Sequence, residues 1–182
     1  MTITADADDF VSGTNISNSY TGLTLSFTGT TISGVNDGII YSVNQSGALV
    51  ASTGSRVFGT SDITYPNLFG GTTTSIFRVD FDAAMFTVSL DALSDDASDF
   101  ARFSAYTAGN VLIDMYTTGI ITSGHAETMT VSGGNIAYVL AEGISPDAVG
   151  FDNLRADTIP IPAAVWLFGS GLGLLGWFRR KK

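Results

Sequence analysis

Apolar and polar residues alternate along much of the first 157 residues, and this period of two limits the fold more than any other feature. Leu23, Leu25 and Phe27 form one side of an extended segment, with threonine and serine on the other side. Successive side chains of a β-strand point to opposite faces, so the pattern predicts a strand with one buried and one solvent-facing side.

The same pattern predicts strands along the rest of these 157 residues. In residues 75–81 and 85–90, the alternation assigns Phe77 and Phe86 to the buried side. Further strands are predicted at residues 39–43, 101–106, 111–116, 126–131, 136–141 and 148–154, with turns at 36–38, 108–110, 133–135 and 145–147. This spacing predicts an all-β fold, an antiparallel β-sandwich with a jelly-roll-like topology, in which residues 58–74 form the longest loop.

Charge divides the chain into a body and a tail. The sequence has 17 acidic residues, all at or before Asp157, and four of its eight basic residues are the last four residues. Residues 1–157 therefore carry four arginines against 17 acids, a net formal charge of −13, and form one predicted domain; residues 158–182 form a basic tail. So acidic a body repels phosphate, which excludes nucleic acid as a partner.

The tail has the dimensions of a membrane span. Residues 159–178 contain no charged residue, and about 20 such residues cross a hydrocarbon core as a helix. Pro160 and Pro162 mark its start, and the basic cluster at its end is expected to stay cytoplasmic, which places the body outside. That cluster consists of Arg179, Arg180, Lys181 and Lys182. A buried terminal helix and a permanent membrane anchor are the two alternatives.

The order of these features resembles a known sorting signal. The proline pair with Ala163, the glycine-rich span AVWLFGSGLGLLG and the terminal RRKK together resemble the PEP-CTERM signal in its VPLPA-type variant. Ile161 stands where the main family has glutamate, and Ile159 and Ile161 replace the valine and leucine of the variant. The resemblance implies recognition by exosortase, a membrane protease-transpeptidase, with processing near Pro160, Pro162 and Ala163, in Gram-negative bacteria that make exopolysaccharide.

The resemblance also implies a destination. Segments of the body such as residues 12–26, 77–82 and 148–155 are similar to those of other exported β-sandwich proteins with this tail, a group without a common activity. The chain is thus expected to pass through the inner membrane and to act at the cell surface or in the extracellular biofilm matrix, in a structural or adhesive role. Residues 1–10 lack a basic-then-apolar leader, so upstream DNA is expected to encode a signal peptide.

Acidic residues at the two ends of the body suggest a calcium site. In jelly-roll carbohydrate-binding modules a structural calcium joins the N-terminal segment to the last strand, and by analogy Asp8 or Asp9 would meet Asp152 here. The alternative is that these are solvated surface acids. A second acidic run, Asp95, Asp96 and Asp99, is interpreted as ordinary loop acids.

Two further functions are weighed against the structural or adhesive role. A carbohydrate-binding module would stack sugars of an extracellular polysaccharide on exposed aromatic rings. The candidates are Tyr41, Tyr65, Phe69, Tyr106, Tyr116 and Tyr138, of which Tyr65 and Phe69 lie in the long loop. An extracellular hydrolase would need paired carboxylates, but Glu127 and Glu142 have no recognisable catalytic setting, and His125 lacks a partner histidine or cysteine. The protein is therefore predicted not to be an enzyme.

Overall fold

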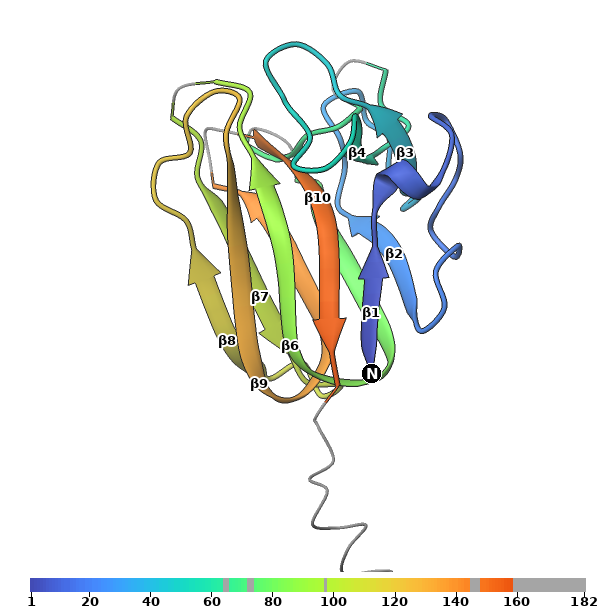
Figure 1. Cartoon of the computed structure of the whole chain (residues 1–182), viewed down its shortest axis with the longest axis vertical. Helices are drawn as coiled ribbons and strands as arrows, with labels where there is room; N and C mark the ends of the chain where they lie inside the picture. Colours follow the sequence, from blue (N-terminus) through green and yellow to red (C-terminus); the bar gives the residue numbers. More distant parts are fainter. Residues whose placement is uncertain (64–65, 72–73, 97, 145–147, 159–182) are drawn as a thin grey trace, which may run out of the picture.

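The computed structural model describes residues 1–63, 66–71, 74–96, 98–144 and 148–158. Within these ranges the chain forms strands β1 to β10 and a short 3-10 turn, η1 (Figure 1). Their bounds are β1 Thr2–Ala5, η1 Ala7–Asp9, β2 Leu23–Thr28, β3 Tyr41–Asn44, β4 Arg56–Gly59, β5 Phe69–Gly70, β6 Ile76–Leu93, β7 Ala101–Tyr106, β8 Leu112–Thr117, β9 Ala126–Gly143 and β10 Ala148–Asp157. The prediction of an all-β body is confirmed.

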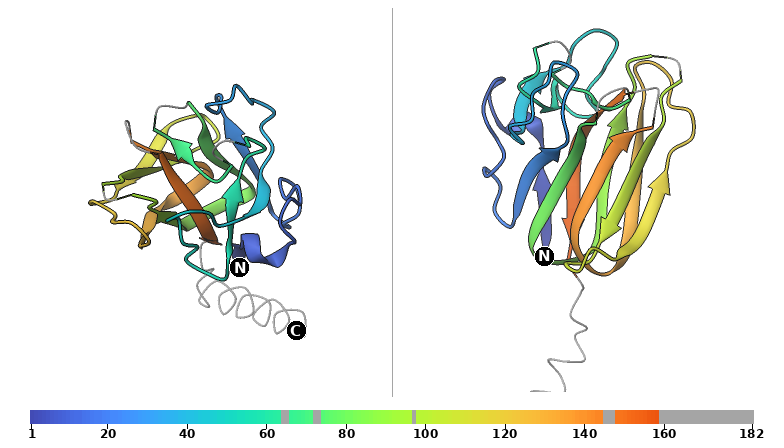
Figure 2. Two further views of the ribbon diagram at one scale, coloured as in Figure 1. Left: turned by 90° about the horizontal axis from the view of Figure 1, so that it is seen from above. Right: turned by 180° about the vertical axis from the view of Figure 1, so that it is seen from behind.

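Two long strands, β6 and β9, organise the molecule because each runs through both of its layers (Figures 1 and 2). Residues 77–80 of β6 pair with residues 138–141 of β9, and this half is flanked by β2, β7 and β8. Residues 87–93 of β6 pair with residues 126–132 of β9, and this half is flanked by β10 and β1. Two mainly antiparallel sheets therefore share their central strands.

Both long strands bend where they pass from one sheet to the other. The register of β6 against β9 shifts on either side of Met85, which pairs with Ile136. Gly133 and Asn135 adopt positive φ angles of 149° and 81°, backbone conformations that glycine and asparagine tolerate better than other residues. The turn predicted at residues 133–135 is wrong, since these residues form a bend within one continuous strand.

The irregular pairing near Met85 also changes which residues of β6 face the core. Val79 and Met85 are buried before the shift, and Val88 is buried after it, so the buried positions move from odd to even numbers. Phe86 is 42% exposed, which contradicts its predicted place in the core. The reason is that a bulge inserts a residue into the period of two and reverses the faces beyond it.

Strand β10 joins segments that are far apart in the sequence. It pairs with β1 along its C-terminal half, with β4 at Phe151 opposite Phe58, and with β5 at Val149 opposite Phe69. Strand β3 extends β4, and β5 also pairs in parallel with β9. Strands β1, β4 and β5 were not among the predicted ones, and β5 lies within the loop predicted at 58–74, which is correspondingly shorter.

Four phenylalanines form the centre of the core. Phe77 has ring centroids of Phe58, Phe69 and Phe151 at 5.2, 5.4 and 5.8 Å, and Phe69 lies 5.5 Å from Phe151. All four side chains are fully buried. Aromatic pairs at such distances stabilise a core by about 0.5–1.5 kcal/mol beyond the burial of their surface. The cluster fastens β4, β5, β6 and β10 to one another.

The predicted membrane helix and its sorting residues, from Pro160 to Lys182, lie outside the described residues. In the part of the chain that is described, no helix has the length and apolar character needed to span a membrane.

Candidate functional site

The two ends of the molecule differ in what they carry (Figure 1). At the terminal end, the amino group of Met1 donates a hydrogen bond to Thr158 Oγ1 at 2.9 Å, beside the hairpin between β7 and β8. The opposite end, called here the loop end, consists of residues 66–71, 74–75, 94–96, 98–100 and 118–125. Strand β6 ends there, β7 and β9 begin there, and β8 leads into it. The candidate sites below are placed relative to these two ends.

The predicted meeting of the N-terminal segment with β10 occurs, but through Asp6. The Thr53 hydroxyl lies 2.9 Å from Asp6 Oδ2 and 3.2 Å from Asp152 Oδ2, so it connects the two carboxylates. Asp152 Oδ2 also accepts hydrogen bonds from the Ser52 hydroxyl at 3.0 Å and the Thr53 N–H at 3.1 Å. Asp152 is 0% exposed, and its Oδ1 has no hydrogen-bond partner. Burial raises the pKa of the Asp152 carboxyl above its ordinary value.

Asp8 and Asp9 have other surroundings than the predicted calcium site requires. The Asp8 carboxylate accepts the N–H groups of Ser55 and Arg56 at 3.1 and 3.2 Å, and its Oδ1 lies 3.5 Å from Arg56 Nη1. Gly54 makes this contact possible, because a Cβ there would lie 2.3 Å from the carboxylate. Asp9 is exposed. Asp8 therefore connects η1 to the start of β4. In the described chain, the three carboxylates that lie at metal-binding distance from one another do not include Asp8 or Asp9.

That group is Asp95, Asp96 and Asp99 at the loop end. One carboxylate oxygen from each lies within 4.8 Å of the other two. Asp99 is 1% exposed, and while its Oδ2 accepts the Asp95 N–H at 3.1 Å, its Oδ1 is buried without a partner. Burial is the main cause that raises the pKa of Asp99 and of Asp95. The interpretation of this run as ordinary solvated acids is thus wrong for Asp99.

Main-chain hydrogen bonds join the loop that carries Asp99 to a second loop. The Ile121 N–H donates to the Asp99 carbonyl at 2.9 Å, and the Gly124 N–H donates to the Ser94 carbonyl at 3.2 Å. Within the first loop, the Ser98 N–H donates to Asp96 Oδ1 at 2.8 Å. The carboxylates are therefore held in place by main-chain contacts between the β6–β7 loop and the β8–β9 loop.

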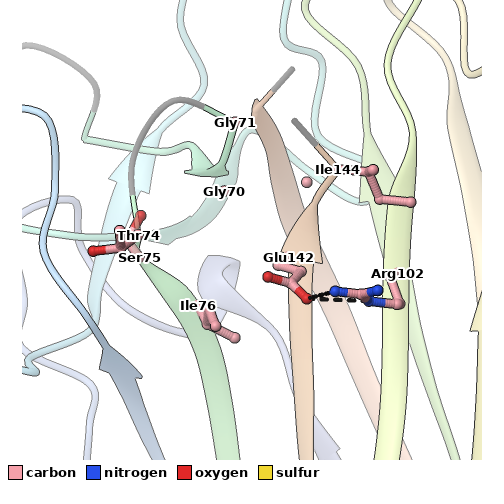
Figure 3. A pocket seen from close by; sticks show the side chains of 9 residues that line it. Gly70, Gly71, Thr74, Ser75, Ile76, Arg102, Glu142 and Ile144 are labelled. Atoms are coloured by element: carbon pink, nitrogen blue, oxygen red, sulfur yellow. Dashed lines mark hydrogen bonds and ion pairs between the residues drawn. The ribbon is translucent and has the colours of Figure 1, made fainter. Parts of the chain in front are cut away.

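A pocket of about 440 Å³ also opens at the loop end (Figure 3). Its polar side chains include Arg102 from β7 and Glu142 from β9, which form an ion pair with Nε 3.1 Å from Oε1. The remaining described lining is Gly70, Gly71, Thr74, Ser75, Ile76, Gly143 and Ile144. Charged groups beside main chain and small side chains can form hydrogen bonds to a polar ligand. Sequence reasoning missed this pocket, because it forms where β5, β6, β7 and β9 converge.

Two of the aromatic residues proposed for sugar stacking, Phe69 and Tyr138, are buried. Phe69 is fully buried in the core cluster, so its prediction as a glycan contact is wrong. Tyr65 lies outside the described residues. Tyr106 and Tyr138 stack on each other at 5.0 Å, and the Arg78 guanidinium lies 4.1 Å from the Tyr138 ring centroid. These neighbours cover Tyr138, which is mostly buried.

The two glutamates and the histidine have separate local partners. Glu127 Oε1 accepts the Tyr116 hydroxyl at 2.8 Å, whereas Glu142 is paired with Arg102. His125 Nδ1 lies 3.1 Å from both the Thr122 hydroxyl and the Ser123 carbonyl. Glu142 is the one carboxylate among the described residues that line the pocket.

Comparison with known proteins supports the class of fold. No protein family and no curated protein matches the sequence. Among solved structures, the chain is similar to the K2 cleaved adhesin domain of Lys-gingipain, with 14% sequence identity and a TM-score of 0.53. The match covers 87% of this chain and all of that domain. The body therefore has a sheet-rich fold resembling an adhesin domain, and at this identity the likeness concerns the fold alone.

Proposed function

We propose that this chain is an exported β-domain that exosortase delivers to the cell surface or the extracellular matrix, where it has an adhesive or structural role in exopolysaccharide. The tail supports the route, since it resembles the PEP-CTERM signal. The observation that supports a surface role for the body is that its two ends differ. Residue 158 lies at the terminal end, beside Met1, while the pocket and the acidic cluster lie at the loop end (Figure 1). Attachment of the body through the chain that follows residue 158, before or after processing, would leave the loop end free to contact a matrix.

The test of this proposal is the mass and the terminal peptides of the protein recovered from its native host. Exosortase processing predicts that material in the outer fraction has lost the tail near Pro160 to Ala163. A Pro160→Ala, Pro162→Ala double variant is expected to keep the tail and to accumulate in the inner membrane. Full-length protein in the outer fraction of both strains would contradict the route, and an intact tail in the inner membrane of the wild type would indicate a permanent anchor.

Carbohydrate binding is the second candidate function, and the pocket favours it. The two-sheet body supports a jelly-roll-like sandwich, an architecture shared with carbohydrate-binding modules. Arg102 and Glu142 would donate to and accept from sugar hydroxyls. Saturable binding of the host exopolysaccharide should then be lost in Arg102→Ala and kept in Arg155→Ala, which removes an exposed arginine away from the pocket. Equal binding by both variants would exclude the pocket.

The proposal treats the protein as non-enzymatic. Among the described residues that line the pocket Glu142 is the single carboxylate, which supports this, because hydrolysis of glycosides generally uses two carboxylates about 5–10 Å apart. A panel of polysaccharide substrates should show no turnover above that of a Glu142→Gln variant. Turnover that this variant abolishes would overturn the assignment.

A further inference from the structure

We propose that Asp95, Asp96 and Asp99 bind a calcium ion that fastens the β6–β7 loop to the β8–β9 loop at the loop end. This site differs from the one expected between the N-terminal segment and β10. It also stands independently of the export route proposed above.

The geometry of the three carboxylates suits one ion. Calcium takes oxygen ligands at about 2.3–2.6 Å, so two oxygens on the same ion lie at most about 5 Å apart. The three carboxylate oxygens of this group lie within 4.8 Å of one another. Carboxylates so close repel each other unless a cation or a proton lies between them. The arrangement therefore needs a cation or a shared proton, and no arginine is paired with these residues among the ion pairs of the described chain.

The buried oxygen of Asp99 is the second observation that points to an ion. A buried carboxylate oxygen without a partner is costly, and such atoms are uncommon in folded proteins. Asp99 Oδ1 is such an atom, in a residue 1% exposed, and it belongs to the carboxylate that meets those of Asp95 and Asp96. A cation bound by the three carboxylates would satisfy this oxygen. Asp96 is exposed, which leaves room for water ligands on the outer side.

The donor set favours calcium over other metal ions. All three side-chain ligands are carboxylates, whereas zinc sites usually include histidine or cysteine. Magnesium requires near-ideal octahedral geometry and gives up its water reluctantly. Calcium accepts irregular sets of oxygen ligands and is commonly bound by extracellular modules with a Kd on the order of 10⁻⁴–10⁻³ M.

The structural effect of the ion follows from the loops it would join. Main-chain hydrogen bonds connect Asp99 to Ile121 and Ser94 to Gly124, so the cluster lies where the two loops meet. An ion there would hold the ends of β6 and β8 and the starts of β7 and β9 in place. The site would thus stiffen the loop end of the molecule.

The proposal is tested by titrating the full chain, purified in detergent, with calcium chloride in a calorimeter. One saturable site is expected, together with a rise in Tm on calcium addition and a fall on chelation. Asp95→Asn and Asp96→Asn should each weaken binding by about tenfold or more, because each removes a charged ligand. The matched control is Asp82→Asn, which removes an exposed acid at the bend of β6 and should bind as the wild type does.

Each outcome decides the proposal. Absence of saturable calcium binding by the folded wild type, or equal affinity in Asp95→Asn, Asp96→Asn and Asp82→Asn, would overturn it. Binding of two calcium ions per chain, one of which is lost in Asp96→Asn, would support this site and indicate a second calcium site elsewhere. Tighter binding of zinc than of calcium would overturn the choice of metal. Circular dichroism of each variant shows whether a loss of binding is a loss of folding; Asp96 is exposed, so its substitution should keep the fold.

Discussion

Two buried aspartates show how the environment of a residue changes the meaning of an acidic sequence. Asp99 and Asp152 are both nearly inaccessible, and each has one oxygen with hydrogen-bond donors and one without. Most of the other acids in this body are more exposed. Burial raises the pKa of both carboxyls, because the charged form is stabilised less in the interior than in water.

The first prediction concerns the pH dependence that Asp152 gives to stability. The pKa of Asp152 is higher in the folded state than in the unfolded state. Its contribution to the free energy of unfolding is therefore fully present below the unfolded pKa of about 4, and it is lost as pH rises through the folded pKa. Asp152→Asn cannot titrate at this position. The free energy of unfolding of the wild type minus that of Asp152→Asn should therefore fall as pH rises from about 4 to 7, by about 1.4 kcal/mol for each unit of pKa difference. Urea unfolding across this range measures it, and a constant difference would contradict it.

The second prediction concerns Gly70, where β5 meets β9. Its φ is +84°, and a Cβ would lie 2.3 Å from the backbone nitrogen and oxygen of Gly143. Gly70→Ala should reduce the free energy of unfolding by about 2–4 kcal/mol, since both the conformation and the contact oppose a side chain. Gly119→Ala is the control, because no atom lies within 4 Å of its Cβ, and it should change stability by no more than about 0.5 kcal/mol. Equal effects in chemical denaturation would refute the close contact.

At the scale of elements, the local pattern predicts strands well and their continuity poorly. Residues 75–81 and 85–90 were predicted as two strands, and 126–131 and 136–141 as two more, yet they form the continuous strands β6 and β9. Glycine and asparagine at 133–135 are typical of a turn, and the sequence alone does not distinguish a turn from a bend between two sheets. Short strands such as β5 depend on partners far away in the chain, so a local pattern does not reveal them.

The same limit explains what could be predicted of the candidate sites. The approach of the N-terminal segment to β10 was predicted by analogy and from topology and is observed, although Asp6 takes the place of Asp8 or Asp9 in the contact. The cluster at 95–99 was visible as acids in a loop, but Asp99 is buried where this loop meets residues 121–124, more than 20 positions away. Phe69 was assigned to a loop surface because β5 was not predicted. The sequence shows where the acidic residues are, whereas tertiary packing determines which of them are buried.

The third prediction tests the change of buried face along β6. Met85 is 1% exposed and Phe86 is 42% exposed, the reverse of what uninterrupted alternation with Val88 requires. Met85→Ala should therefore destabilise the protein by about 2–5 kcal/mol, the range for large-to-small changes in a core. Phe86→Ala removes more atoms but should cost less than about 1 kcal/mol, as its ring is already partly in water. A larger loss for Phe86→Ala in thermal or urea unfolding would place the bulge elsewhere.

At the scale of the whole molecule, charge and topology give the body a direction. Both described termini lie at one end, while the pocket and the acidic cluster lie at the other (Figures 1 and 2). The body is strongly acidic and the last four residues are basic, so the charge that would stay in the cytoplasm is separated from the domain that would be exported. An anionic body is also repelled by anionic lipid head groups, which favours an orientation directed away from the membrane.

The last prediction measures this orientation in the full chain before processing. The sequence contains no cysteine, so single substitutions Ile63→Cys and Val111→Cys can each carry one fluorophore. Both positions are exposed. Val111 lies in the hairpin between β7 and β8 at the terminal end. Ile63 follows β4, and β4 runs antiparallel to β10 and therefore toward the loop end. With the tail inserted in a lipid vesicle, energy transfer to an acceptor in the bilayer should be stronger from position 111 than from position 63. Equal transfer would mean that the body lies on its side, and stronger transfer from position 63 would mean that the loop end faces the membrane, which contradicts its availability to a matrix.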